Sequence, residues 1–281
     1  MEAPQSDGLL FDFQPMTDTI ICLDVDGTLT DHQGRIHPED AEILASYRRA
    51  SFVLATGRLL PSLRRTFAKN DLFADRPIPL PMVLQNGAAL YKPDERLEAH
   101  YPFPAQTQAA LIDAMETHRR IAYLLFSLSE VHILWPTPLA QEILQRFDLD
   151  AQTFDQASRQ KRFTKAICVA DDPEAVEEFA SSIAGLSLET SYSIPTVFEL
   201  TRAGIDKGRG LLTLLDALGL DEASIVTVGD GGNDLPMFDV ADLALAPDTS
   251  PKAIQERADH VVQATPGGLL TSVLRMTGVK L

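Results

Sequence analysis

The chain has 281 residues and a formal net charge of −16, which argues against the basic surface that nucleic-acid-binding and anionic-membrane-binding proteins carry. Hydrophobic residues make up 45% of the sequence, so the chain can bury a core, and its length suggests about two domains. Two cysteines form no disulfide framework, the N-terminus has no basic leader, and no apolar stretch reaches the ~18 residues of a membrane helix. We therefore expect a cytoplasmic protein without membrane or nucleic-acid partners; an oligomeric state does not follow from the sequence.

Short apolar runs alternate with helical stretches in the first part of the chain. Residues 1–18 are expected to form a tail. The predicted elements after it are strands at 20–23, 52–55 and 82–84 and helices at 39–50 and 58–70. Residues 87–195 change character: prolines interrupt a mixed pattern of strands and helices, which predicts a separate α+β domain inserted into the first.

The alternation of strands and helices resumes after residue 195. A helix is predicted after Lys207, a strand at 224–228, and then two more strands and three helices up to residue 277. Strands that alternate with helices indicate a parallel sheet covered on both faces. The predicted fold is α/β: a Rossmann-like parallel-sheet core formed by residues 19–86 and 196–281, interrupted by an inserted α+β cap at 87–195.

Acidic side chains follow two of the predicted strands. Asp24 and Asp26 end the first strand, two residues apart, so both side chains are expected to leave the chain on the same side. Asp230 and Asp234 follow the strand at 224–228 across a glycine-rich turn. Ligands bind at the carboxyl ends of parallel strands, so the four carboxylates are predicted to face one point. Because such charges repel one another, the pattern predicts a Mg²⁺ site.

Groups that could bind an anion lie beside these carboxylates in the predicted fold. Thr56 and Gly57 follow the strand at 52–55 and offer a hydroxyl and a backbone N–H. Lys207 begins a helix, where a cation opposes the helix dipole, and this position indicates that its side chain has a ligand to meet. With a divalent cation, these groups indicate phosphoryl transfer, in which one aspartate attacks and a second acts as acid and base.

The polar residues at these strand ends resemble, in order, the four motifs of the haloacid dehalogenase phosphatase superfamily. The motifs are residues 24–29, residues 56–58, Lys207 and residues 229–234, and the insertion resembles the large cap of the Cof-type and sugar-phosphatase branch. The resemblance covers nearly the whole chain from residue 19. One stretch departs from the Cof-type pattern: residues 245–249 stand where an Asn-Ala pair is usual.

The resemblance implies a role for each matching carboxylate. Asp24 would be the nucleophile that becomes an aspartyl-phosphate, and Asp26 would be the general acid and base. The Mg²⁺ ligands would be Asp24, Asp26 through its carbonyl, Asp230 and, in or just outside the first shell of ligands, Asp234.

The resemblance also implies a phosphate-binding set and a lid. The phosphate would be bound by Thr56, Gly57 and Lys207, with Asn233 orienting the phosphate or the lysine. Asn86 would contact the substrate side, and residues 85–88 resemble the loop that leads into the cap. The inserted domain is expected to close over the site.

The predicted function is a Mg²⁺-dependent phosphatase acting on a small phosphorylated metabolite, a sugar or polyol phosphate. Three alternatives stay open at this point. A phosphomutase on the same fold would return the phosphoryl group to its sugar. Phosphatases of sucrose phosphate or mannosyl-phosphoglycerate share the architecture that the resemblance implies. A non-catalytic receiver module also uses an acidic pocket, Mg²⁺, a threonine and a lysine, but it has no insertion of roughly a hundred residues.

Overall fold

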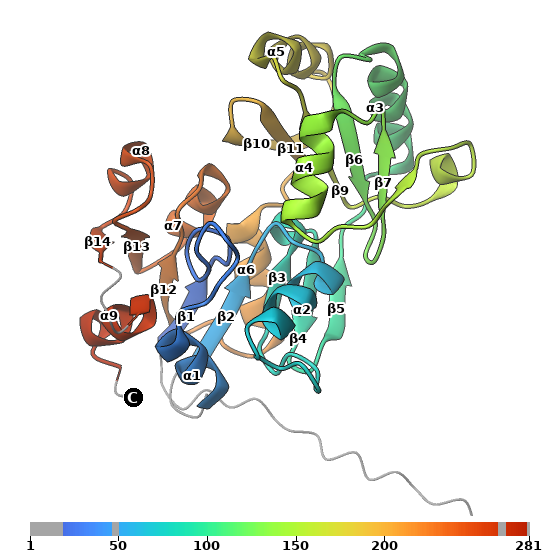
Figure 1. Ribbon diagram of the computed structural model, residues 1–281. Coiled ribbons are helices and arrows are strands. Elements are labelled where there is room, and N and C mark those ends of the chain that lie inside the picture. Colours follow the sequence, from blue (N-terminus) through green and yellow to red (C-terminus); the bar gives the residue numbers. More distant parts are fainter. Residues whose placement is uncertain (1–18, 47–50, 264–267, 280–281) are drawn as a thin grey trace, which may run out of the picture.

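The computed structural model describes residues 19–46, 51–263 and 268–279, which form two sheets with helices around them (Figure 1). The predicted tail at residues 1–18 lies outside the described residues. The larger sheet has the strand order β14-β13-β12-β1-β2-β3-β4-β5. Its strands are β1 (Thr19–Leu23), β2 (Ser51–Ala55), β3 (Met82–Leu84), β4 (Ala89–Lys92), β5 (Arg96–His100), β12 (Ser224–Val228), β13 (Leu243–Pro247) and β14 (His260–Val262).

Helices cover both faces of the larger sheet, as predicted. The side chains of β1 alternate between two apolar clusters: Ile21 and Leu23 pack with α1, α2 and α9, whereas Ile20 and Cys22 pack with α6, α7 and α8. These helices are α1 (Pro38–Ser46), α2 (Leu60–Lys69), α6 (Lys207–Ala217), α7 (Leu235–Phe238), α8 (Lys252–Gln255) and α9 (Gly268–Thr277). Successive apolar residues of β1 thus point to opposite faces and are buried on both, as expected for a sheet that helices cover on both sides.

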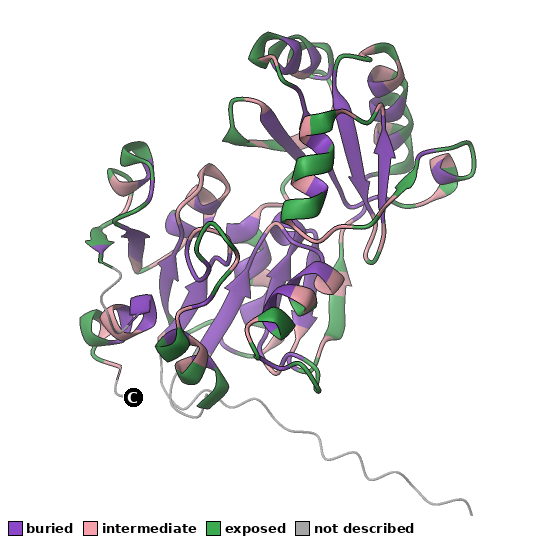
Figure 2. Cartoon of the chain, viewed as in Figure 1, coloured by how far each residue is buried: buried purple, intermediate pink, exposed green. Residues whose placement is uncertain are grey.

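The smaller sheet forms the core of the cap and has the strand order β10-β11-β9-β6-β7-β8. Its strands are β6 (Ala122–Phe126), β7 (Val131–Leu134), β8 (Ala151–Thr153), β9 (Lys165–Val169), β10 (Leu188–Ile194) and β11 (Val197–Arg202). Helices α3 (Ala105–Thr117) and α5 (Pro173–Ser182) pack on one apolar cluster, and α4 (Pro138–Arg146) packs on another, which includes Leu59 of the larger domain. Figure 2 shows buried residues along the central strands of both sheets and exposed residues on the edge strands and on the outer faces of the helices.

The boundaries of the two sheets differ from the predicted domain boundaries at residues 87 and 195. Strands β4 and β5 extend the larger sheet, because a one-turn 3-10 helix, η1 (Gln85–Gly87), returns the chain antiparallel to β3. Strand β11 pairs with β9 and β10 in the smaller sheet and ends at Arg202. Within the described ranges, no helix is both long and apolar enough to cross a membrane.

Candidate active site

Three polar strand ends meet at one edge of the larger sheet, as the sequence predicted. Strands β12, β1 and β2 are neighbours and run parallel, so their carboxyl ends lie side by side. Asp24 directly follows β1, Thr56 directly follows β2, and Asp230 follows β12 after one glycine. The backbone N–H of Asp24 donates to the carbonyl of Val228 at 2.9 Å, which holds the end of β1 against the end of β12.

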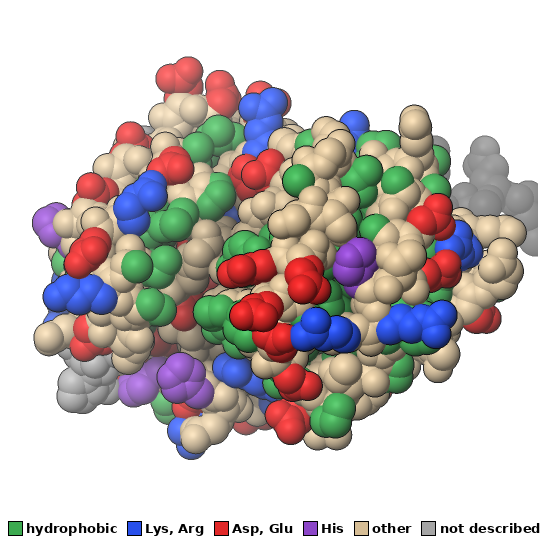
Figure 3. Space-filling model, turned by 90° about the horizontal axis from the view of Figure 1, so that it is seen from above, with side chains coloured by type: hydrophobic (Ala, Val, Ile, Leu, Met, Phe, Trp, Pro, Cys, Tyr) green, Lys and Arg blue, Asp and Glu red, His purple; other side chains and the backbone are tan. Residues whose placement is uncertain are grey.

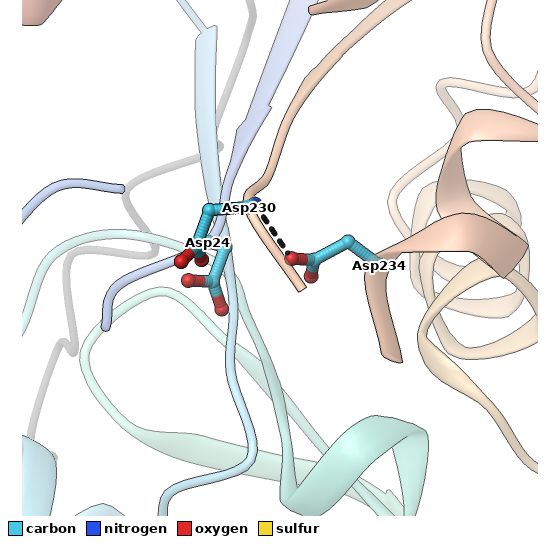
Figure 4. A group of neighbouring side chains, drawn as sticks. All are labelled: Asp24, Asp230 and Asp234. Atoms are coloured by element: carbon cyan, nitrogen blue, oxygen red, sulfur yellow. Dashed lines mark hydrogen bonds between the residues drawn. The ribbon is translucent and has the colours of Figure 1, made fainter. Parts of the chain in front are cut away.

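An acidic cluster lies at this edge and consists of Asp24, Asp230 and Asp234 (Figure 4). One carboxylate oxygen from each residue lies within 4.8 Å of the others. Asp24 and Asp234 are buried, with 4% and 0% of their surface exposed. Carboxylate oxygens gathered in this way are the ligands that Mg²⁺ uses in proteins.

Lys207 lies between two of these carboxylates. Its ammonium Nζ donates to Oδ1 of Asp24 and to Oδ1 of Asp234, each at 2.6 Å, and the side chain is fully buried. Lys207 is the first residue of α6, and Asp206 caps that helix by accepting from the N–H of Arg209. The two carboxylates explain why a cation stands at the unfavourable end of a helix dipole.

The pKa shifts in the acidic cluster indicate more negative charge than Lys207 can balance. Burial raises the pKa of Asp24 well above its usual range, and Lys207 only partly opposes this shift. Burial and the charge of Asp234 raise the pKa of Asp230 to about 6. Burial alone would lower the pKa of Lys207, but Asp234 and Asp24 outweigh it and raise this pKa. One ammonium faces three carboxylates, so the donor set fits a divalent cation.

Asp234 also organises the loop that follows β12. Its Oδ2 accepts from the backbone N–H groups of Asp230 at 2.9 Å and Gly231 at 2.8 Å, while its Oδ1 binds Lys207. A Cβ on Gly229 would lie 2.5 Å from the carboxyl carbon of Asp234, so the approach of this loop requires glycine. Asp234 therefore orients both the loop and the lysine.

Asp26 does not join the three clustered carboxylates, contrary to the expectation that all four face one point. Its two oxygens accept from Arg58, with Nε 2.8 Å from Oδ2 and Nη2 2.7 Å from Oδ1. The rule that alternate residues share a side applies to extended strands, and β1 ends at Leu23. Gly27, with a φ of +88°, then turns the chain back. Arg58 is the last residue of the motif at residues 56–58, and sequence reasoning assigned it no role in the site.

The predicted anion-binding residues lie next to the acidic cluster. Thr56 is fully buried, and its Oγ1 accepts from the N–H of Arg58 at 3.2 Å. The carbonyl of Gly57 accepts from Lys165 Nζ of the cap at 3.1 Å. A Cβ on Gly57 would lie 2.9 Å from that ammonium, so the core loop and the cap are in close contact here.

A buried polar network joins the larger domain to the cap. Asn233 donates from Nδ2 to Oδ1 of Asn86 at 3.2 Å, and Asn86 donates from its own Nδ2 to Oε2 of Glu199 at 2.8 Å. Glu199, on β11, forms an ion pair with Lys165 on β9. Burial alone would raise the pKa of Glu199, but Lys165, Ser193 and Asn86 together outweigh it and lower this pKa. Sequence reasoning missed the Lys165–Glu199 pair, because charged residues within strands look like solvent-facing positions.

A cavity of about 320 Å³ lies between the two domains beside the acidic cluster. Asp24, Thr56 and Asp230 line it from the larger domain, and Phe126 and Lys165 line it from the cap. The structure therefore brings all the predicted catalytic and phosphate-binding residues except Asn86 and Lys207 to the wall of one cavity. Those two residues lie directly behind that wall, in contact with Asn233 and Asp24.

Comparison with known proteins gives the family. Residues 21–267 match the family model of the haloacid dehalogenase-like hydrolases. The phosphoglycolate phosphatase of Haloarcula marismortui is 30% identical over 258 residues, 90% of this chain and 95% of that protein. The pyridoxal phosphate phosphatase YbhA of Escherichia coli is 26% identical over 262 residues, 88% of this chain and 94% of that protein.

Solved structures agree on the fold. The haloacid dehalogenase subclass IIB sugar phosphatase BT4131 superposes with a TM-score of 0.75 at 19% identity, over 93% of this chain and 100% of that one. At this identity the likeness shows the fold, whereas the family model and the Haloarcula relative show the family. The chain therefore belongs to the haloacid dehalogenase-like hydrolases, as a phosphatase of their Cof-type branch.

Proposed function

We propose that the protein is a Mg²⁺-dependent phosphatase that hydrolyses a small phosphorylated metabolite, a sugar or polyol phosphate, through an aspartyl-phosphate on Asp24. The observation that carries the proposal is the position of Asp24: a buried carboxylate held by Lys207 at the wall of a cavity. An ionised carboxylate needs no base to attack phosphorus. Burial disfavours this ionised form of Asp24, whereas Lys207 favours it and a bound Mg²⁺ would favour it further. Lys207 binds Oδ1, which leaves the other oxygen of Asp24 available as the nucleophile.

In the first step, an oxygen of Asp24 forms a bond to phosphorus and the bond from phosphorus to the leaving oxygen breaks. Thr56 Oγ1, the N–H of Gly57 and Lys207 would bind the phosphoryl oxygens. Mg²⁺, held by Asp24, Asp230, the carbonyl of Asp26 and, in or just outside its first shell of ligands, Asp234, would neutralise charge on those oxygens.

Asp26 would transfer the protons in both steps. It would donate a proton to the leaving oxygen as the ester bond breaks, and it would then take a proton from the water that attacks the aspartyl-phosphate. The second attack releases inorganic phosphate and regenerates Asp24. Asp26 and Arg58 both line the cavity, so Asp26 can face the reacting oxygen while it stays bound to Arg58.

The size of the cavity supports a small substrate. Its volume of about 320 Å³ is at the lower end of the ~300–1,000 Å³ that ligand pockets span. The wall combines apolar side chains such as Phe126 and Ile167 with the buried Lys165–Glu199 pair. A compact metabolite with a few polar groups would match this wall.

We also propose a cytoplasmic location and no nucleic-acid or membrane partner. Both cysteines, Cys22 and Cys168, are buried free thiols, which suits a reducing compartment. On the face seen in Figure 3, acidic and basic side chains are interspersed, and the chain as a whole is acidic. A protein with a net charge of −16 repels polyanions such as nucleic acids.

The test is phosphate release from a panel of sugar, polyol and carboxylic-acid phosphates and pyridoxal phosphate, with Mg²⁺ or with a chelator. The Asp24→Asn variant is expected to lose at least about a thousandfold in rate, because the nucleophile is removed. The matched control is Asp216→Asn, on the exposed face of α6. Wild-type rates in Asp24→Asn would refute the mechanism, and an isomerised sugar phosphate without free phosphate would instead identify a phosphomutase.

A further inference from the structure

The guanidinium of Arg58 uses its donors on both domains. Two of them bind Asp26, as described above. The remaining nitrogen, Nη1, donates to Ser62 Oγ at 2.9 Å, to Thr66 Oγ1 at 2.7 Å and to the carbonyl of Phe147 at 3.5 Å. Arg58 is only 7% exposed, so this arrangement is enclosed rather than solvated. The first two acceptors belong to α2, whereas Phe147 belongs to the cap.

The segment of the cap that reaches Arg58 is the C-terminal end of α4. Phe147 caps this helix, and its carbonyl also accepts from Ser62 Oγ at 2.6 Å. Its ring centroid lies 5.0 Å from the Arg58 guanidinium carbon. One residue further, Asp148 forms an ion pair with Lys69 of α2 at 2.6 Å. Two cations, Lys69 at the end of α2 and Arg58 just before its start, thus lie near the negative end of the α4 dipole, and Arg58 is the more buried of the two.

We propose that Arg58 is a positioning residue that sets the direction of the Asp26 carboxylate and couples this direction to the docking of Phe147. The proposal rests on the proposed function, because it assigns Asp26 a proton to transfer. A bidentate guanidinium–carboxylate contact fixes the orientation of both groups. Ser62, Thr66 and Phe147 fix the guanidinium in turn. A displacement of Phe147 would therefore move the Arg58 guanidinium and, with it, the Asp26 carboxylate.

A direct role of Arg58 in binding the phosphoryl group would have a different signature. The phosphoryl group is the same in every substrate, so losing a phosphoryl ligand would slow all substrates alike. Losing the direction of a proton donor slows only those whose leaving oxygen needs a proton. The phenolate of p-nitrophenyl phosphate leaves readily without one, whereas an alkoxide does not.

The experiment measures single-turnover cleavage of p-nitrophenyl phosphate and of the best alkyl phosphate of the substrate panel. In Arg58→Gln we expect about a hundredfold loss on the alkyl phosphate and less than about threefold on p-nitrophenyl phosphate, since general acid catalysis contributes ~10²–10⁴-fold. The ratio of the two rates does not depend on the fraction of folded protein. Arg58→Lys is expected to show the same selective loss, because an ammonium cannot bind both carboxylate oxygens in this way.

The link to the cap is tested with Ser62→Ala, which removes the hydroxyl that joins Arg58 to the Phe147 carbonyl. We expect a selective loss on the alkyl phosphate of about tenfold in the wild-type background and none in the Arg58→Gln background. Lys69→Gln is the control, because it removes an exposed contact to the same cap segment without touching Arg58.

Equal losses of Arg58→Gln on both substrates, full alkyl-phosphate activity of Arg58→Lys, or additive losses of Ser62→Ala would each overturn the proposal. Failure of the proposed function looks different: Asp24→Asn would then retain activity on both substrates. The two failures are therefore distinguishable in the same set of assays.

Discussion

Replacing Lys207 with methionine removes the only cation bound to two buried carboxylates among the described residues. Nζ of Lys207 lies 2.6 Å from an oxygen of Asp24 and 2.6 Å from an oxygen of Asp234, and the lysine side chain has no exposed surface. Methionine fills a similar volume, so the change isolates the charge. Breaking a buried pair by removing one partner costs ~3–5 kcal/mol, and we expect Lys207→Met to fall in this range in the absence of divalent cations.

The loss should depend on pH in a defined direction. The pKa of Lys207 is raised on folding, and its unfolded value is about 10.4, so the lysine is protonated in both states at pH 5 and at pH 8 and its own titration adds no pH dependence between them. Asp24 differs, because burial already raises its pKa and Lys207 opposes that shift. Without Lys207 the pKa of Asp24 rises further, and protonation then relieves the buried charge. The destabilisation should therefore be smaller near pH 5 than near pH 8.

Urea unfolding of wild type and Lys207→Met at both pH values measures this difference. Lys69→Met is the matched control, because Lys69 also forms a 2.6 Å ion pair but its side chain is 62% exposed. The control should lose only ~0–1 kcal/mol, with no such pH trend. A loss below about 1 kcal/mol in Lys207→Met near pH 8, or equal losses at the two pH values, would refute the reasoning.

Two further predictions concern Mg²⁺ and the turn before β4. The pKa of Asp230 is raised to about 6, so its carboxylate must lose a proton to bind a cation near pH 5. The rise in melting temperature caused by Mg²⁺ should therefore increase from about pH 5 to about pH 7. An equal rise at both pH values would contradict Asp230 as a ligand. Gly87→Ala should cost about 2 kcal/mol or more, since its φ is +93° and the new Cβ would lie 2.1 Å from the Asp206 carbonyl oxygen. Gly219→Ala, at a φ of +69° with open space around it, should cost only about 1 kcal/mol in the same urea assay.

The sequence predicted the parts of the fold that local patterns determine. Alternating strands and helices predicted a parallel sheet covered on both faces, and the two apolar clusters around β1 confirm it. The cap boundaries depend on which strands pair across the chain. Nothing local distinguishes β4 and β5, which join the larger sheet, from strands of the cap.

The candidate site divides in the same way. Asp24, Thr56 and Asp230 could be placed together because each follows a strand whose direction was predictable, and Lys207 stood out at a helix start. The Asp26–Arg58 contact could not be predicted. Strand β1 ends at Leu23, and the rule that alternate residues point to the same side holds only within an extended strand. The direction of Asp26 is set by a tertiary partner, as is the burial of Lys165 and Glu199 within the cap sheet.

The position of β1 has a consequence for how the protein is made. This strand lies between β2, which follows it closely in the sequence, and β12, whose Ser224 pairs with Thr19. During synthesis on the ribosome, the hydrogen bonds between β1 and β12 cannot form until the whole cap has been synthesised. Pairing between such distant segments slows folding, because the intervening loop must close first. We therefore expect the cap to acquire its structure early and the catalytic sheet to be completed only when the C-terminal third of the chain has emerged.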